Sequence, residues 1–380
     1  MTLRSFAGAL IAAASLVGSP ACVHSYAGSP PLQYPELRYE SVDGKAWPEQ
    51  SLALPEIRSQ YHLLVDPRVT YIELNPGGAR TLIFLHGLGS YLKFWRYQLD
   101  QFAARGDRVI AIDMLGYGKS DKPASFPYTM EAMADVVLAV IRRTNATKPV
   151  LIGHSMGGQV ALSFAIRYPN EASALVLTAP AGFEEFGDRE KRWLSKVFTV
   201  PLIAGASEYE IWGSVRYNNF YRWKPEYEWL IEERVRTAKN DTFKSYAYAN
   251  VKSVRGLCEN DFVRLNLDKV TVPTLIVHGD RDRLIPNPFM HGGDTRKVME
   301  YGHQKIRGSR LVTLEDCGHT VQMDCADEYN KAVGDFLSSL PAPAPAEPRA
   351  APAPAPAVAP PAEAPPAAPA PSSATEPAGE

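Results

Sequence analysis

One serine in the sequence stands at a turn that would make it a nucleophile. Residues 150–160 read V-L-I-G-H-S-M-G-G-Q-V, so an apolar, β-branched run leads into a glycine-flanked serine and a helical pattern follows at once. The glycines are needed because a side chain at either place would collide with the neighbouring strand or helix at so sharp a bend. The pattern predicts that the Ser155 hydroxyl is held above a sheet, at the positive end of a helix.

Two later side chains are of the types that activate a serine. A serine hydroxyl is a weak nucleophile without an adjacent base, and the base needs an acid that orients it. Asp282 lies in Gly-Asp-Arg-Asp, after an apolar run and ahead of Pro286, and His319 follows the last apolar run in Cys-Gly-His. The sequence therefore predicts a nucleophile, an acid and a base in the order Ser155, Asp282, His319.

The elements that must position these residues are short apolar strands alternating with helices. Most of the strands are uniformly apolar, which is typical of strands buried on both faces of a parallel sheet. The predicted fold class is α/β, with a doubly wound, mostly parallel sheet. The predicted strands are residues 69–74, 81–85, 108–112, 150–152, 173–177, 274–277 and 310–314, and the predicted helices include 95–104 and 130–143.

The motifs collect where those strands end. Residues 86–89, 153–157, 279–286 and 318–319 each directly follow a predicted strand. Ligands of such sheets bind outside the carboxyl ends of the strands, so the fold is expected to bring these motifs together. The turn Asn-Pro-Gly-Gly at 75–78 predicts a hairpin that leads into a central strand.

The alternation of strands and helices stops between residues 182 and 270. This insert holds four of the six tryptophans among charged helical segments, and we interpret it as a helical cap over the site. Most of its aromatic side chains are expected to form the cap's own core, and a few to face the pocket. The expected organisation is an irregular lead-in at 28–57 with an edge strand near 37–41, a core at 58–182 and 271–340, the cap at 183–270, and an extended, disordered Ala-Pro tail at 341–380.

On these motifs the chain resembles the α/β-hydrolase family, in particular members with a helical cap inserted after the sixth strand. The resemblance covers roughly residues 69–340. It implies that Ser155 is the nucleophile, Asp282 the acid and His319 the base. Asp280 is left as a helper or a solvated carboxylate.

The same resemblance implies an oxyanion hole built from the backbone N–H groups of Leu88 and Met156. The donors are main-chain groups because negative charge develops on one oxygen, and fixed dipoles meet it without rearranging. The side chains of these two residues are then free to vary and to form pocket wall.

The resemblance implies a serine hydrolase that cleaves a carboxylic ester of a small acyl or aryl substrate through an acyl-serine intermediate, without a cofactor. A serine does not fit the alkyl-aspartate chemistry of epoxide hydrolases and haloalkane dehalogenases. One alternative is carbon-carbon bond hydrolysis of the meta-cleavage type, although those enzymes carry asparagine and tryptophan where this chain has His154 and Thr320. The other alternative is a ligand receptor of the same fold with little turnover.

Several polar residues near the motifs are interpreted as structural. His86 and His154 are expected to hydrogen-bond the loops that contain them, and His278 is expected to end its strand. Asp113, in D-M-L-G-Y-G-K-S, is expected to shape a loop without taking part in catalysis.

Composition excludes several classes of partner. A formal net charge of -2 with dispersed Lys and Arg provides no basic patch for nucleic acid. Cys22, Cys258, Cys317 and Cys325 show no metal-binding spacing, so no metal site is expected. Cys317 and Cys325 bracket His319 and are either a disulfide or free thiols. The oligomeric state is left open.

The N-terminus is typical of an export signal. Arg4 precedes an apolar stretch at 6–18 that is too short to span a bilayer. Either residues 1–27 are a signal peptide, or residues 1–21 are removed and Cys22 becomes a lipidated first residue. Both interpretations predict a periplasmic or extracellular protein, and the second predicts membrane anchoring.

Overall fold

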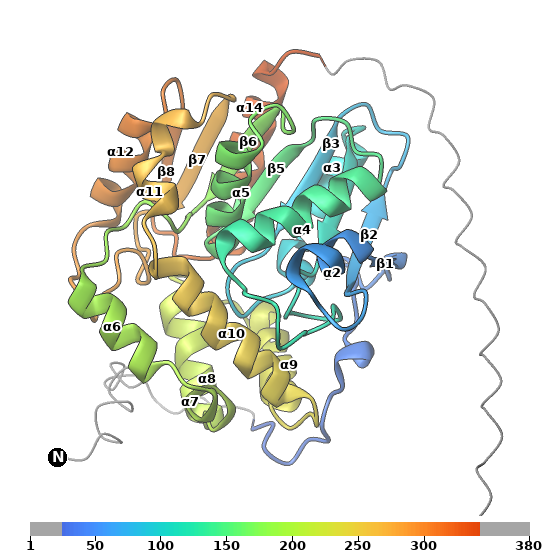
Figure 1. Cartoon of the computed structure of the whole chain (residues 1–380), viewed down its shortest axis with the longest axis vertical. Coiled ribbons are helices and arrows are strands. Elements are labelled where there is room, and N and C mark those ends of the chain that lie inside the picture. The colour runs from blue at the N-terminus through green and yellow to red at the C-terminus, as the bar shows by residue number, and fades with distance from the viewer. Residues whose placement is uncertain (1–24, 343–380) are drawn as a thin grey trace, which may run out of the picture. The chain divides into compact units, whose positions relative to one another are not determined.

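A single eight-stranded sheet carries the fold, as the computed structural model of residues 25–342 shows (Figure 1). Its strands are β1 (Glu49–Ala53), β2 (Arg68–Leu74), β3 (Thr81–Leu85), β4 (Arg108–Ile112), β5 (Val150–His154), β6 (Ala174–Thr178), β7 (Thr274–Gly279) and β8 (Arg310–Leu314). They lie in the order β1-β2-β4-β3-β5-β6-β7-β8. Only the β1–β2 and β2–β4 pairs are antiparallel. The predicted α/β class with a mostly parallel sheet is confirmed.

The central strands are buried along their whole length, because helices cover both faces of the sheet. Arg108, the one charged residue in them, is compensated: its Nε donates to Glu73 at 2.7 Å. Figure 1 shows α4 and α5 in front of the sheet and α14 behind it. The helices of the core are α2 (Pro55–Tyr61), α3 (Leu99–Ala104), α4 (Met130–Arg143), α5 (Met156–Arg167), α12 (Thr295–Lys305), α13 (Val321–Asp324) and α14 (Ala326–Ser339).

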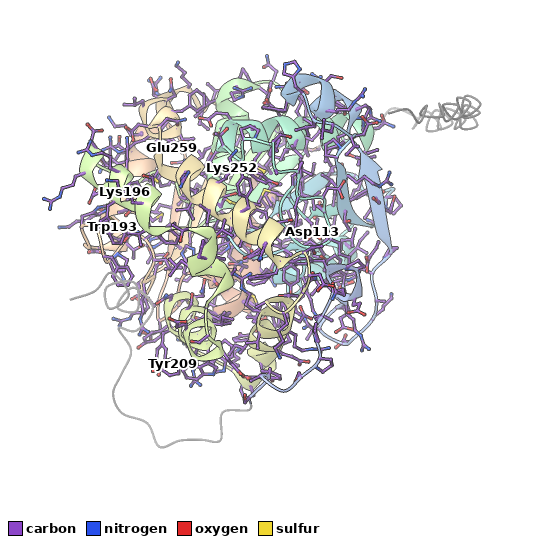
Figure 2. All side chains as sticks on the ribbon, turned by 60° about the horizontal axis from the view of Figure 1, so that its bottom comes forward. Asp113, Trp193, Lys196, Tyr209, Lys252 and Glu259 are labelled. Atoms are coloured by element: carbon purple, nitrogen blue, oxygen red, sulfur yellow. A yellow bond between two sulfur atoms is a disulfide. The ribbon has the colours of Figure 1, made fainter. Side chains whose placement is uncertain are left out.

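The chain between β6 and β7 is helical. Figures 1 and 2 show its longer helices gathered beyond one end of the sheet, and Figure 2 looks onto them. The α-helices of this segment are α6 (Asp188–Val197), α7 (Val200–Ala204), α8 (Glu208–Gly213), α9 (Glu228–Thr237), α10 (Phe243–Cys258) and α11 (Phe262–Leu265). We refer to residues 183–270 as the cap.

Two local predictions are wrong. β2 and β3 form no hairpin ladder, because β4 lies between them and pairs with both. The turn that follows β2 packs against the start of β4: a Cβ on Gly78 would lie 2.2 Å from the backbone nitrogen of Arg108.

The expected edge strand near 37–41 is also absent from the described chain. Residues 49–53 take that place as β1, paired with β2. Upstream, Pro35 favours a single 3-10 turn over Tyr34–Glu36, and residues 37–48 contribute only an isolated bridge between Glu40 and Ala46.

The predicted export signal up to residue 24, including Cys22, and the Ala-Pro tail from residue 343 lie outside the described residues. Within residues 25–342, none of the helices has the length and apolar character needed to cross a bilayer.

Candidate active site

Ser155 occupies a strained turn between β5 and α5. Its φ of 51° and ψ of -113° are values that a residue with a side chain rarely adopts. The flanking glycines make the turn possible: a Cβ on Gly153 would lie 2.3 Å from the Gly157 carbonyl oxygen, and one on Gly157 would lie 2.3 Å from that of Leu85. A side chain at either glycine would therefore collide with the neighbouring helix or strand, as the sequence predicts.

The main chain of Ser155 is held on both sides of the turn. Its N–H donates to the Thr178 carbonyl of β6 at 2.9 Å, and its carbonyl accepts from the amide of Ala181 at 3.0 Å. The hydroxyl is therefore carried by a rigid backbone at the start of α5, whose dipole favours negative charge there.

His319 and Asp282 are directly hydrogen-bonded. His319 Nδ1 lies 2.8 Å from Asp282 Oδ2, and the two side chains are 4% and 0% exposed. The second oxygen of Asp282 accepts from the amides of Leu284 at 2.8 Å and Ile285 at 3.0 Å. A ring whose Nδ1 faces a carboxylate presents Nε2 as its basic nitrogen.

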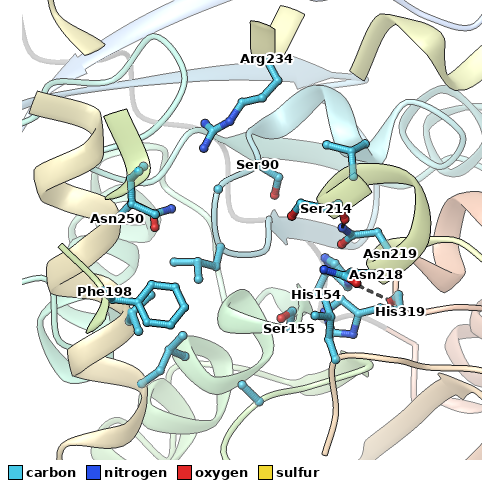
Figure 3. A pocket seen from close by; sticks show the side chains of 18 of the residues that line it. Ser90, His154, Ser155, Phe198, Ser214, Asn218, Asn219, Arg234, Asn250 and His319 are labelled. Atoms are coloured by element: carbon cyan, nitrogen blue, oxygen red, sulfur yellow. Dashed lines mark hydrogen bonds between the residues drawn. The ribbon is translucent and has the colours of Figure 1, made fainter. Parts of the chain in front are cut away.

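Ser155 and His319 line one cavity, where Figure 3 shows them close together. The structure thus brings all three residues predicted from the motifs to the carboxyl edge of the sheet. Ser155 follows β5, Asp282 follows β7 and His319 follows β8, and these strands lie in the order β5-β6-β7-β8 in the sheet.

The loop that carries His319 is fixed by a residue that the motifs do not reveal. Asp324 is buried, and its carboxylate accepts from the amides of Gly318 at 2.7 Å, Tyr221 at 2.8 Å and Arg222 at 2.9 Å. It therefore joins the histidine loop to the cap. Its position five residues after the histidine was the only signal available in the sequence.

A disulfide closes the same loop. Cys317 and Cys325 are bonded to each other, which decides between the two states considered for them. Cys258 is a free, buried cysteine. His319 therefore lies inside a covalently closed segment of the chain.

The two amides implied for an oxyanion hole lie on either side of the serine. Met156 begins α5, and Leu88 follows Gly87, where a Cβ would lie 3.4 Å from the Ser155 Cβ. Within the part of the chain that the structure describes, neither amide donates a hydrogen bond. The arrangement thus offers two uncommitted main-chain donors next to the nucleophile.

His86 and His154 have structural partners. His86 Nδ1 faces the Gly87 carbonyl at 2.8 Å and Nε2 accepts from the Met114 amide at 3.0 Å, so a neutral ring satisfies both. Burial lowers the pKa of His86 to about 4. His154 Nε2 lies 3.1 Å from the His319 carbonyl, and burial holds its pKa well below the usual range.

The other polar residues near the motifs also hold loops. His278 is the penultimate residue of β7 and not, as was expected, its last; its Nδ1 lies 3.2 Å from the Gly279 carbonyl and its Nε2 2.9 Å from the Thr313 hydroxyl. Asp113 is buried and accepts from the amides of Leu92 and Lys119, both at 2.8 Å; burial raises its pKa to about 6.

Asp280 takes a place apart from the histidine. Its carboxylate accepts from the Asp316 amide at 2.6 Å and lies 3.5 Å from Arg281 and 3.6 Å from Arg296. It therefore shapes the loop around Asp282, which is the acid that contacts the ring.

The cavity above Ser155 has a volume of about 470 Å³ and extends into the cap. Trp193 of α6, labelled in Figure 2, is the one cap tryptophan on its wall. Trp212 and Trp223 pack with other cap residues, whereas Trp229 packs against Tyr91 and Phe94 of the core. Two of the four cap tryptophans therefore build the cap's own core, as expected for most of its aromatic side chains.

Among residues 25–342, no group of three or more His, Cys, Asp or Glu side chains is arranged to hold a metal ion.

Comparison with known proteins gives a consistent family. The alpha/beta hydrolase fold family matches residues 80–326. An AB hydrolase superfamily protein of Bacillus subtilis, YisY, is 28% identical over 286 residues, which cover 73% of this chain and 99% of that protein. Monoacylglycerol lipase abhd6-A of Xenopus laevis is 26% identical over 287 residues, covering 70% of this chain and 77% of the lipase.

Solved structures share the architecture. A probable hydrolytic enzyme of Pseudomonas aeruginosa PAO1 superposes with a TM-score of 0.70 at 23% identity, covering 82% of this chain and 99% of that chain. An esterase of Exiguobacterium antarcticum superposes with a TM-score of 0.61 at 24% identity, covering 73% and 98%. At these identities the superpositions show the fold alone.

Proposed function

We propose that this chain, which belongs to the alpha/beta hydrolase fold family, hydrolyses carboxylic esters through an acyl-serine intermediate. Ser155 attacks the ester carbonyl while His319 accepts its proton and then protonates the departing alcohol. Asp282 stabilises the imidazolium that forms. The observation that carries the proposal is the buried 2.8 Å hydrogen bond between His319 and Asp282, beside a serine that lines the same cavity.

The free amides of Leu88 and Met156 suit the charge that this reaction creates. In the tetrahedral intermediate the carbonyl oxygen of the ester becomes an anion, and main-chain donors held in place bind it without reorganisation. In the second half-reaction a water, activated by the same histidine, releases the acid from Ser155.

The cavity favours a small substrate. Its volume of about 470 Å³ lies within the range of roughly 300–1,000 Å³ found for small-molecule sites. The cap covers it, and its walls include apolar side chains such as Trp193 and Phe198, so an acyl or aryl ester fits better than a polymer. A relative named as a monoacylglycerol lipase supports ester hydrolysis.

We also propose that the chain is exported and that processing leaves Tyr26 in place. Tyr26 is 8% exposed and packs with Ile211, Ile231 and Val235. Its N–H donates to Glu208 at 2.6 Å. Cleavage after residue 27 would remove these contacts, which favours the alternative in which Cys22 is the lipidated first residue. Intact-mass analysis of the exported protein tests this: a chain beginning at Gly28 would contradict it.

The test of the reaction compares the wild-type protein with Ser155→Ala on p-nitrophenyl butyrate and on a ring-fission dienone. We expect ester turnover by the wild type and a loss of at least about 10³-fold in the variant. Turnover of the dienone alone would instead identify a carbon-carbon hydrolase. Labelling of Ser155 by a fluorophosphonate without repeated turnover of any ester would indicate a receptor.

A further inference from the structure

An N-terminal segment that precedes the family match is bound to the cap. We name residues 25–37 the strap. Lys239 Nζ donates to three of its carbonyl oxygens, those of Tyr26 at 2.8 Å, Ala27 at 2.7 Å and Ser29 at 2.8 Å. Further along, the Leu32 amide donates to the Arg236 carbonyl at 3.2 Å. The strap therefore follows the end of α9, and its course is fixed by main-chain contacts.

The strap places Tyr34 in the wall of the cavity. Tyr34 is 8% exposed, lines the cavity and packs against Tyr246, with ring centroids 6.2 Å apart. Its buried hydroxyl meets no hydrogen-bond partner among residues 25–342. A buried hydroxyl without a partner is costly, so this one is expected to serve an acceptor that arrives with a ligand. Burial raises the pKa of Tyr34 far above neutrality, so the hydroxyl is a donor.

Arg234 of α9 is a second donor on the same wall. Its guanidinium lies over the ring of Tyr246 at 4.4 Å, and Figure 3 shows it directed toward the cavity on the side of Ser90 and Asn250. Within the described chain it forms neither an ion pair nor a side-chain hydrogen bond. The adjacent carboxylate, Glu233, is engaged elsewhere.

Glu233 does not neutralise Arg234, because both of its oxygens have other partners. One accepts from Lys93 Nζ at 2.8 Å and the other from the Tyr91 hydroxyl. Lys93 is itself buried, with Glu40 at 3.7 Å as a second carboxylate. These two carboxylates are thus turned to Lys93, and Arg234 is a cavity-lining cation that contacts no carboxylate within the described chain.

We propose that Tyr34 and Arg234 form a subsite for a carboxylate carried by the substrate, so that the preferred esters contain a second, ionised acid group. The inference rests on the proposed ester hydrolysis. A carboxylate has two oxygens, one for the phenol and one for the guanidinium, and such charge-assisted hydrogen bonds are strong. Tyr246 connects the subsite to the reaction centre: its ring contacts Tyr34 and Arg234, and its hydroxyl is 3.5 Å from the carbonyl of Gly89, next to Leu88.

Two matched pairs of esters test the subsite, one for each side of the ester bond. Monomethyl adipate and methyl hexanoate differ only in a carboxylate or a methyl at the end of the acyl chain. 4-Acetoxybenzoate and 4-methylphenyl acetate differ in the same way on the alcohol. The variants are Tyr34→Phe and Arg234→Gln, with Tyr209→Phe and Arg189→Gln as controls at exposed cap positions.

We expect the wild type to prefer the acidic member of at least one pair by about 10-fold or more in kcat/KM. Arg234→Gln should lower that preference by about 10- to 100-fold and Tyr34→Phe by about 3- to 10-fold, mainly through KM. The neutral esters and both control variants should change by less than about twofold. Calorimetric binding of adipate to the wild type, weakened in Arg234→Gln, is expected as the readout that does not depend on turnover.

The inference is overturned if the neutral esters are hydrolysed without any preference for the acidic ones, or if both variants slow acidic and neutral esters equally. That result leaves the proposed ester hydrolysis intact. If instead no ester is hydrolysed but adipate binds through Arg234, the subsite stands and the proposed function falls.

Discussion

The two sides of the cavity are built in different ways. On the sheet side, the side chains of His319 and Asp282 are at most 4% exposed, and the serine turn is packed against main-chain atoms. On the cap side, α6 buries one residue, Leu194, and α7 buries none. Tyr34 and Arg234 also have polar groups without a partner in the described chain. The sheet side is therefore suited to fix one reaction, and the cap side to select its substrate.

The largest effect is expected on the sheet side, from a change to the acid Asp282. Asp282→Asn keeps the shape of the side chain but removes the charge that orients and stabilises the histidine, so kcat should fall by about 10⁴-fold. Steady-state kinetics with an ester measures it, and circular dichroism checks the fold. Asp280→Asn is the matched control, because that carboxylate faces the Asp316 amide. A folded Asp282→Asn protein with kcat within tenfold of the wild type would contradict the assignment.

Low pH should lower the free energy of unfolding, because the buried His86 on the sheet side is neutral in the folded protein. Its pKa is about 4 in the folded protein and about 6.5 in an unfolded chain. The unfolded chain therefore binds more protons between these values, so the free energy of unfolding falls as pH drops from about 6.5 to about 4, by at most about 3 kcal/mol. The buried His154 acts in the same direction.

Urea unfolding at a series of pH values measures this dependence. His86→Gln should show a smaller decrease toward acid than the wild type, and His62→Asn, on an exposed turn, should not. An equal decrease in all three proteins would show that His86 does not remain neutral in the native state.

Opening the disulfide should have a smaller effect on the same side. The bond closes a loop of eight residues, which corresponds to about 2 kcal/mol of stability, and His319 lies inside that loop. The double variant Cys317→Ser, Cys325→Ser should lose about that much stability and about tenfold in kcat as the ring loses its position. Urea unfolding and ester kinetics measure both, with Cys258→Ala as the control. If the double variant loses neither stability nor kcat, hydrogen bonds alone hold the loop.

The smallest effect is expected on the cap side. Trp193→Ala removes a side chain from the cavity wall, so KM for long-chain esters should rise by about 3- to 10-fold while short esters change little. Trp212→Ala, from the cap's own cluster, should lower stability and leave the chain-length profile unchanged. Kinetics over a series of p-nitrophenyl esters separates the two. A uniform fall in kcat for Trp193→Ala would mean that the cap takes part in the reaction.

The same division limits what the sequence predicts. Uniformly apolar runs and a glycine-flanked serine have local physical causes, so seven of the eight strands and the helix at 130–143 could be located, the helix with the bounds found in α4. β1 was missed because its residues are exposed or half-buried and form no apolar run. Ser155, Asp282 and His319 could be placed together because the carboxyl ends of parallel strands lie at the same edge of the sheet. The hairpin prediction failed because local turn residues do not show that β4 inserts between β2 and β3.

Residues on the cap side, and the residue that holds the histidine loop to the cap, could not be recognised from their neighbours in the sequence. Tyr34 reaches the cavity because carbonyl oxygens of the strap bind Lys239, about 200 residues away in the chain. Asp324 was missed because its three partners are amides, which any sequence supplies. Such contacts depend on tertiary packing, which periodicity and spacing do not encode.

The most direct test of the central claim is to stop the reaction with p-nitrophenyl butyrate within its first turnovers and to analyse the protein by mass spectrometry. The account predicts a butyryl group on the peptide that contains Ser155. Ester turnover by the wild type with no acyl group on Ser155, or undiminished turnover by Ser155→Ala, would contradict the account.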